Sequence, residues 1–267
     1  MNNKDKLELY KRERIGQRFL NKYNEWFTVL EYNNARDVLV KFDNGYSYKI
    51  VWKQITNGTV HSPYAKTVYD IGYIGEGKYK PYIRKGEESV EYKFWNGLLR
   101  RCYDPYSLNK AHWYRECYVE NELHNFQSFC KWHNENYYEV PNDRMELDKD
   151  ILNKGNKIYS KDTMIYVPRR INTLFTKNNT NRGNLPIGCY RKENEIYVQC
   201  SILDEKGNKK HKYLGRFPLD KPFQAFTCYK NFKENYIKQM ADEYYSKELI
   251  PKKLYDAMYK YEVEIND

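Results

Sequence analysis

The sequence has no long apolar run and no closely spaced cysteine pair, and both absences exclude classes of protein. No apolar stretch approaches the roughly 18 residues of a membrane-spanning helix, and the first residues, Met-Asn-Asn-Lys-Asp-Lys, lack the apolar core of a signal peptide. The six cysteines are widely spaced, and none forms a Cys-x-x-Cys motif. This spacing argues against a structural zinc site or a disulfide framework. We therefore expect a cytoplasmic protein that does not span a membrane.

Histidine is also scarce, and its spacing does not indicate a metal site. Three of the five histidines, His112, His124 and His133, lie in the middle of the chain. None of them forms a His-x-x-x-His pair, and a separation of nine positions puts His124 and His133 on opposite sides of a helix. A role in a core or at the solvent is favoured over metal binding for all three.

Tyrosine and positive charge are abundant. The 29 tyrosines supply much of the 40% hydrophobic content of the 267 residues, a length that suits two or three small domains. The net charge of +10 indicates a polyanionic partner, and nucleic acid is the first candidate.

The sequence pattern of the N-terminal part predicts short strands. Residues 26–32, 37–42 and 46–52 have strand patterns, and the turn Asp43-Asn44-Gly45 joins the last two as a hairpin. We predict a small antiparallel β-barrel over residues 1–75, which resembles the SH3 type. A structural role and a DNA-contacting role stay open for it, and we assign it no site. Three glycines that follow, at 72, 75 and 77, indicate a linker.

Two amphipathic helices are expected next. Residues 92–103 carry apolar side chains at positions 94, 95, 98, 99 and 102, and residues 123–134 place Leu123, Phe126, Phe129 and Cys130 on one face.

Residues 146–160 combine carboxylates, amides and a lysine around the turn Lys154-Gly155-Asn156. A helix-like run from Val167 to Leu174 follows, with Pro168 in its first turn. The expected order is strand, turn, strand and helix. This order, with an aspartate on the first strand and Asn172 on the helix, resembles the ββα-metal core of HNH endonucleases, and most closely the phage-borne HNH proteins that carry an AP2-type DNA-binding domain. The two preceding helices match the support helices of that family.

The resemblance implies a metal-dependent, homing-type endonuclease. In the family, an Asp and a helix Asn or His hold one divalent ion on the scissile phosphate, and a His beside the Asp activates water. Asp148 and Asn172 fall on the metal positions, for Mg²⁺ or Mn²⁺, and Lys149 falls on the catalytic His position. A free lysine side chain has a pKa of about 10.4 and is a poor base at neutral pH. Catalysis therefore requires a buried lysine or a metal-bound hydroxide; a ββα scaffold that only binds phosphate is the alternative.

Arg169 and Arg170 begin the same helix and are candidate phosphate clamps. The polar residues 177–184 then lead to three expected strands, at residues 187–191, 196–203 and 209–217, and a long helix at residues 223–245.

This third segment resembles an AP2 domain through Pro186-Ile187-Gly188-Cys189, the strand from Tyr197 to Ile202, and Tyr213-Leu214-Gly215-Arg216-Phe217. AP2 domains lay their sheet in the major groove, so the resemblance implies double-stranded DNA as the partner. The expected contacts come from outward-facing strand residues: Arg191, Lys192, Gln199, Lys210, Lys212 and Arg216.

The charge distribution supports DNA binding independently of the resemblance. Residues 169–238 contain 15 lysines and arginines against 6 acidic residues, a surplus of nine within a chain whose net charge is +10. Phosphate contact requires such a local basic surface, although a solvated charged face produces the same count.

These observations predict an α+β, multidomain protein. The expected parts are the barrel (1–75), an HNH-like ββα-metal domain with support helices (76–180), an AP2-like domain (184–247) and a tail (248–267) that packs on a domain or on a second copy, which leaves a homodimer open. The expected function is HNH-type DNA hydrolysis, in a bacterial host cell if the protein is phage-borne. A non-catalytic DNA-binding regulator or phage factor is the alternative, and a module that binds an acidic protein is a third reading.

Overall fold

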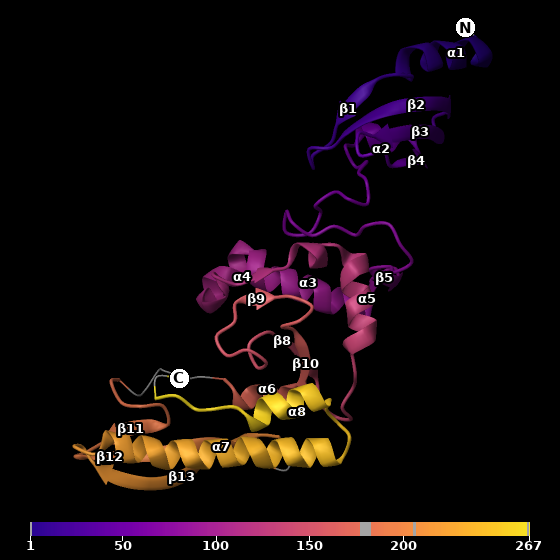
Figure 1. The fold of residues 1–267 in the computed structure, drawn as a ribbon. Helices are drawn as coiled ribbons and strands as arrows, with labels where there is room; N and C mark the ends of the chain where they lie inside the picture. The colour runs from indigo at the N-terminus through magenta and orange to yellow at the C-terminus, as the bar shows by residue number, and fades with distance from the viewer. Residues whose placement is uncertain (1, 177–182, 205–206, 266) are drawn as a thin grey trace. The chain divides into compact units, whose positions relative to one another are not determined.

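The computed structural model describes residues 2–176, 183–204, 207–265 and 267 (Figure 1). Two compact units divide the chain, Met1–His133 and Asn134–Asp267, and each is described by itself. Helices and strands occur in both, which confirms the α+β class. The four predicted parts divide the chain more finely than these units do and stay predictions.

The first unit begins with a helix and an antiparallel sheet of four strands. The helix is α1 (Asn3–Arg14), and the strands are β1 (Arg18–Leu20), β2 (Trp26–Asn34), β3 (Asp37–Phe42) and β4 (Ser47–Ile50). Val38, Val40 and Phe42 alternate into the core of this sheet, as their spacing predicts.

The predicted closed barrel is wrong. The strands pair in the order β1-β2-β3-β4, so in the described part of the chain β1 and β4 are the edges of an open sheet. The strand predicted to run to Trp52 stops at Ile50, because the chain turns there into the short helix α2 (Trp52–Thr56). The backbone N–H of Val51 donates to Oε1 of Gln54 at 3.0 Å, which fixes that turn. A four-residue strand at one edge and a three-residue strand at the other do not close a barrel.

The glycines at 72, 75 and 77 are packed tightly and do not form a free linker. A Cβ atom on Gly72 would lie 2.4 Å from Cδ1 of Leu99 and 2.9 Å from Cζ2 of Trp95, both on helix α3 (Val90–Tyr103). A Cβ atom on Gly77 would lie 2.2 Å from Oε1 of Gln127, on helix α5 (Phe126–Asn136). Glycine is required here because the backbone approaches the helices so closely.

We expect Gly72→Val to lower the free energy of unfolding by about 1–3 kcal/mol, the usual cost of overpacking a core. Gly97→Ala, within the helix α3 that Gly72 packs against, is the control, because a Cβ atom on Gly97 meets no other atom within 4 Å. Alanine should leave stability unchanged or raise it by up to about 1 kcal/mol. Urea unfolding of both variants tests the pair, and equal stabilities would contradict this account of Gly72.

Helices α3 and α5 carry the predicted apolar faces. Trp95, Leu98 and Leu99 are fully buried, and the indole N–H of Trp95 donates to the carbonyl of Leu123 at 2.8 Å. Helix α5 starts three residues later than predicted, because Oδ1 of Asn125 accepts from the backbone N–H of Gln127 and caps the helix. The remaining elements of the unit are β5 (Tyr82–Arg84), β6 (Glu87–Glu88), α4 (Pro105–Lys110), η1 (His112–Tyr114), β7 (Tyr118–Val119) and η2 (Asn121–His124).

His124 and His133 lie in the interior of this unit, with 9% and 3% of their surface exposed. Burial lowers the pKa of both imidazoles, because the charged form loses its water. A neutral packing role, as predicted, fits both positions.

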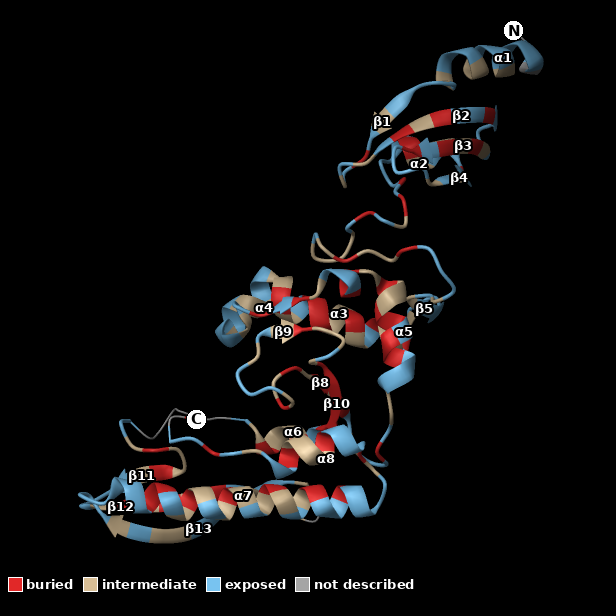
Figure 2. Ribbon diagram, viewed as in Figure 1, coloured by how far each residue is buried: buried red, intermediate tan, exposed pale blue. Residues whose placement is uncertain are grey.

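The second unit contains the predicted strand–strand–helix order, with a different second strand. Strand β8 (Met145–Asp148) pairs antiparallel with β10 (Ile165–Pro168), and helix α6 (Arg169–Leu174) follows at once. The short strand β9 (Ile158–Tyr159) lies within the segment that joins them. Strand β10 is buried throughout (Figure 2). Pro168 has extended backbone angles and ends β10, so the prediction that it lies inside the helix is wrong by one residue.

The predicted three strands and long helix follow in the same unit. Strands β11 (Cys189–Lys192), β12 (Glu195–Leu203) and β13 (Lys209–Pro218) pair antiparallel in that order. Helix α7 (Pro222–Ser246) covers one face, where Ile196, Val198 and Phe226 are buried together. This confirms the arrangement of these elements, while the AP2 likeness stays a prediction.

The segment 248–267 packs back on the same unit, as predicted. Helix α8 (Lys252–Tyr259) lies on α7, and Val263 belongs to the core beneath the sheet. The ammonium of Lys154, between β8 and β9, donates to Oδ2 of Asp267 at 2.8 Å. The segment therefore ties the β8–β9 loop to the sheet and helix.

Candidate metal centre and nucleic-acid interface

Asp148 stands at the end of β8, on the strand face opposite the buried core. Met145 and Leu147 point inward with 6% and 2% exposure, so Glu146 and Asp148 share the other face. Oδ1 of Asp148 accepts from the backbone N–H groups of Asp150 and Ile151, each at 2.8 Å. These two bonds close a tight turn after the strand and fix the carboxyl group in place.

The carboxyl group of Asp148 binds its proton unusually tightly. Burial, followed by the neighbouring Asp150 carboxylate, raises its pKa from about 3.8 to about 6, against the opposing effect of the two backbone donors. Such shifts are common at functional sites, because a site built for a cation brings negative charges together.

This shift predicts a stability that falls as the pH rises. Between about pH 4 and pH 6 the unfolded chain has lost the Asp148 proton while the folded chain keeps it, so ionisation destabilises the fold progressively up to the folded pKa. Asp148→Asn cannot ionise, and we expect it to be more stable than wild type at pH 7.5 by up to about 3 kcal/mol. The two proteins should converge near pH 4 in urea unfolding. A difference in stability between Asp148→Asn and wild type that does not change with pH would contradict the raised pKa of Asp148.

Lys149, predicted at the catalytic base position, is buried and ion-paired. It is 7% exposed, and its Nζ donates to Oδ2 of Asp150 at 3.0 Å. The same ammonium lies 5.8 Å from the centre of the Tyr159 ring. This arrangement makes Lys149 the counter-charge of Asp150.

Asn172 reaches β8, as predicted, and its partner there is Glu146. Its Nδ2 donates to Oε2 of Glu146 at 2.7 Å, and Nε of Arg169 lies 3.9 Å from Oε1 of the same carboxylate. Sequence reasoning missed Glu146 and Asp150. The alternation Glu146-x-Asp148 was the available signal for Glu146, since every second strand residue shares a face.

The candidate ligands on this strand face and on α6 are oxygens, which suit Mg²⁺ or Mn²⁺. Glu146 and Asp148 supply carboxylates, and the amide of Asn172 has its oxygen left once Nδ2 is bonded to Glu146. Within the described residues, no three His, Cys, Asp or Glu side chains are grouped to hold a metal ion. An ion would therefore rely on one or two carboxylates, water and a substrate phosphate, which is the usual mode of Mg²⁺.

The two predicted phosphate clamps have different surroundings. Arg169 is exposed beside Glu146. Arg170 lies beside Gly207, where a Cβ atom would be 2.7 Å from its Nε, and it hydrogen-bonds to Tyr244 of α7. Arg170 thus joins α6 to the sheet and helix, and Arg169 is the one more open to a ligand.

A β-bulge decides which side chains of the sheet face away from α7. Val198 pairs with Gly215, and Gln199 pairs with Tyr213, so Leu214 is the extra residue and the alternation of β13 reverses there. The register places these residues on the face away from α7: Tyr190, Lys192, Glu195, Tyr197, Gln199, Ser201, Lys209, His211, Tyr213 and Arg216. We call this set the open face.

Three of the six predicted DNA contacts, Lys192, Gln199 and Arg216, belong to the open face. The register puts the other three on the helix side: Arg191 opposite Ile196, Lys210 opposite Ile202, and Lys212 opposite Cys200. The ammonium of Lys212 lies 4.8 Å from the centre of the Phe232 ring of α7, which agrees with this assignment.

A row of tyrosines crosses the open face and was missed by the sequence reasoning. Ring centres are 5.8 Å apart for Tyr190 and Tyr197, and 5.9 Å apart for Tyr197 and Tyr213. The ammonium of Lys192 lies 5.5 Å from the Tyr197 ring. A hydrogen bond with Tyr197, followed by the nearby Glu195 carboxylate, raises the pKa of Arg216. Positive groups are thus held among aromatic rings at the surface.

No family model, no curated protein and no solved structure matches this chain. The likeness to HNH and AP2 proteins therefore stays a prediction from the residues. Of the helices in the described ranges, none is long and apolar enough to cross a bilayer.

Proposed function

We propose that the protein binds double-stranded DNA through the open face. The observation that carries the proposal is the register of the sheet, which puts Lys192, Lys209 and Arg216 on the same face as the tyrosine row. Arginine and lysine neutralise phosphates and release counterions, which supplies most of the affinity for a polyanion. The remaining basic residues of the region keep the surrounding surface positive.

Side chains on the open face also suit base recognition. A two-stranded ribbon of the width of β12 and β13 fits the major groove of B-form DNA. Gln199, Ser201 and His211 lie between the basic residues, and Oγ of Ser201 is 3.4 Å from Nδ1 of His211. Glutamine pairs with adenine, and serine with several bases, in that groove. Basic residues therefore position the duplex while these polar residues contact base edges.

Fluorescence anisotropy of a labelled duplex, titrated with the full chain in EDTA, tests the proposal. We expect saturable binding that a polyglutamate competitor of equal charge does not abolish. Binding to polyglutamate that displaces the duplex completely would favour the reading in which the basic surface engages an acidic protein.

A second candidate function is metal-dependent hydrolysis of the bound DNA, favoured by the carboxylates of Glu146 and Asp148 on one strand face and by the bond from Asn172 to Glu146. When bound, a divalent ion polarises the phosphate and lowers the pKa of its water. Asp148 and the Asn172 amide would hold the ion, and exposed Arg169 would bind the phosphate. Lys149, at the position of the family's catalytic histidine, is ion-paired with Asp150, so a metal-bound hydroxide is the proposed nucleophile.

Relaxation of supercoiled plasmid tests this second function. Nicking in Mg²⁺ or Mn²⁺ that disappears in EDTA would support an endonuclease. A protein that shifts the plasmid and never cuts it would be the non-catalytic regulator or phage factor on the same scaffold.

A further inference from the structure

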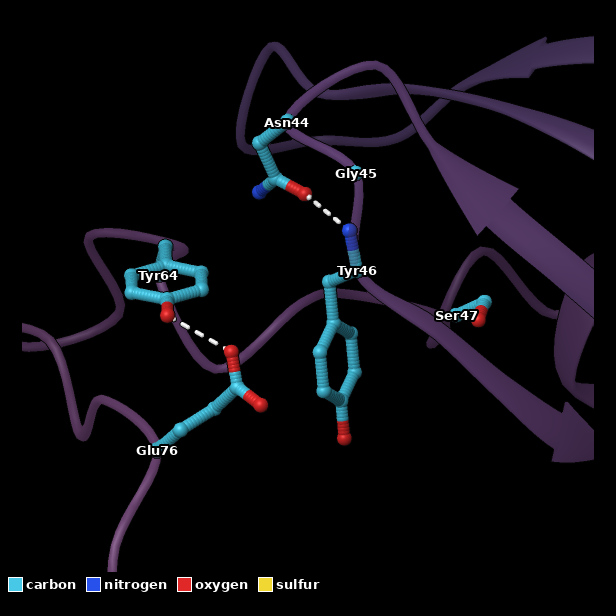
Figure 3. A pocket seen from close by; sticks show the side chains of 6 residues that line it. All are labelled: Asn44, Gly45, Tyr46, Ser47, Tyr64 and Glu76. Atoms are coloured by element: carbon cyan, nitrogen blue, oxygen red, sulfur yellow. Dashed lines mark hydrogen bonds between the residues drawn. The ribbon is translucent and has the colours of Figure 1, made fainter.

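The first unit contains a surface cleft of about 660 Å³ that the DNA-binding proposal does not use. Figure 3 shows its lining: Asn44, Gly45, Tyr46 and Ser47 from the β3–β4 turn, and Tyr64 and Glu76 from the segment after α2. The hydroxyl of Tyr64 donates to Oε1 of Glu76 at 2.6 Å. Two aromatic rings and one carboxylate therefore border the same space.

Hydrogen bonds hold the two walls of the cleft together. Nδ2 of Asn44 donates to Oγ of Ser62 at 3.1 Å, and the same hydroxyl accepts from the backbone N–H of Tyr64 at 3.0 Å. The backbone N–H of Gly75 donates to the carbonyl of Pro63 at 2.9 Å, which places Glu76 beside Tyr64. Ser62 is 1% exposed and also hydrogen-bonds to Glu25. The cleft is thus formed before any ligand arrives.

The charge of the cleft is opposite to that of the chain. Its lining contains Glu76 and no lysine, arginine or histidine, whereas the whole protein carries +10. A carboxylate repels phosphate, and tyrosine rings attract cations through their negative faces. In Figure 3 the Glu76 carboxylate is drawn between the Tyr64 and Tyr46 side chains, and all three line the same cleft.

We propose that this cleft binds the side chain of an arginine or lysine from another protein. Tyr46 and Tyr64 contact the cation through their rings, and Glu76 contributes the opposite charge. Asn44 and Ser47 add polar groups that accept hydrogen bonds from a guanidinium or ammonium group. The site is independent of the open face, because it shares no residue with it.

Arginine and its uncharged analogue citrulline provide the decisive comparison. Nα-acetyl-arginine amide, Nα-acetyl-lysine amide and Nα-acetyl-citrulline amide are titrated into the full chain, and binding is followed by saturation-transfer NMR. We expect both cationic probes to bind at least about fivefold more tightly than citrulline, from a cation–π contact and a carboxylate together. Adenosine monophosphate, which has aromatic and anionic groups, should not displace them.

Three variants test whether the cleft is where the cationic probes bind. Glu76→Gln and Tyr64→Leu should each weaken binding of the arginine probe about two- to fivefold, and Tyr64→Phe should retain most of it. Glu31→Gln, an exposed carboxylate on β2, is the matched control and should bind as wild type does. Equal binding of arginine and citrulline, displacement by adenosine monophosphate, or wild-type affinity in Glu76→Gln would each overturn the proposal. Far-UV circular dichroism confirms that each variant is folded.

Discussion

Asp148→Asn is expected to reduce metal-dependent DNA cleavage by about 10²–10³-fold while duplex affinity in EDTA stays within about twofold of wild type. The substitution removes the negative charge that holds a cation, and a loss of about 3–4 kcal/mol of transition-state stabilisation corresponds to this factor. Asparagine keeps an oxygen at the position that accepts from the Asp150 and Ile151 backbone. The turn after β8 should therefore survive, and the rate of plasmid relaxation measures the chemistry alone.

Asp162→Asn is the matched control for this experiment. Asp162 lies in the same β8–β10 connection, and its side chain is exposed, while its backbone carbonyl accepts from Lys253 and is unchanged by the substitution. Its cleavage rate should equal that of wild type. Cleavage that persists in Asp148→Asn, or that falls equally in Asp162→Asn, would show that the activity does not come from the β8 carboxylates.

Replacing Lys192, Lys209 and Arg216 together with alanine is expected to weaken duplex binding by about 10²–10³-fold at moderate salt. Each residue that neutralises one phosphate adds about 0.9 to the slope of log affinity against log salt concentration. The slope should therefore decrease by about 2.7 if all three contact phosphates. Anisotropy titrations over a series of salt concentrations measure both quantities.

The three basic residues that the register puts on the helix side provide a control with the same change of charge. Arg191, Lys210 and Lys212 replaced together with alanine also remove three positive charges from the same sheet. We expect this variant to bind at least tenfold more tightly than the open-face variant, because only long-range attraction is lost. Equal losses in the two variants would mean that net charge, and not the open face, determines binding.

Local patterns predicted the elements well, because each depends on neighbouring residues. The Asp43-Asn44-Gly45 turn, the apolar stripe of α3 and the three strands before α7 are all present where periodicity and turn residues place them. The pairing of strands that lie far apart in the sequence was harder to predict. The sequence around Tyr159 suggested the partner of β8, but the structure pairs β8 with β10, whose four residues are all buried.

The errors at the candidate site have local physical causes. Strict alternation along β13 groups Lys210, Lys212 and Arg216 on one face, but the bulge at Leu214 reverses the alternation between them. Asn172 was placed on the correct helix, and its bond to Glu146 depends on how α6 crosses β8, which no spacing in the sequence specifies. The four-stranded sheet stays open at β4 because helix α2 begins where a longer strand was expected.

Photo-crosslinking at two neighbouring positions of β13 tests the central claim most directly. Tyr213 lies on the open face and Lys212 on the helix side, so p-benzoylphenylalanine at each position samples opposite faces of one strand. If the open face binds DNA, a labelled duplex should crosslink strongly at position 213 and weakly at position 212. Equal yields at both positions, or crosslinking at position 212 alone, would contradict the account.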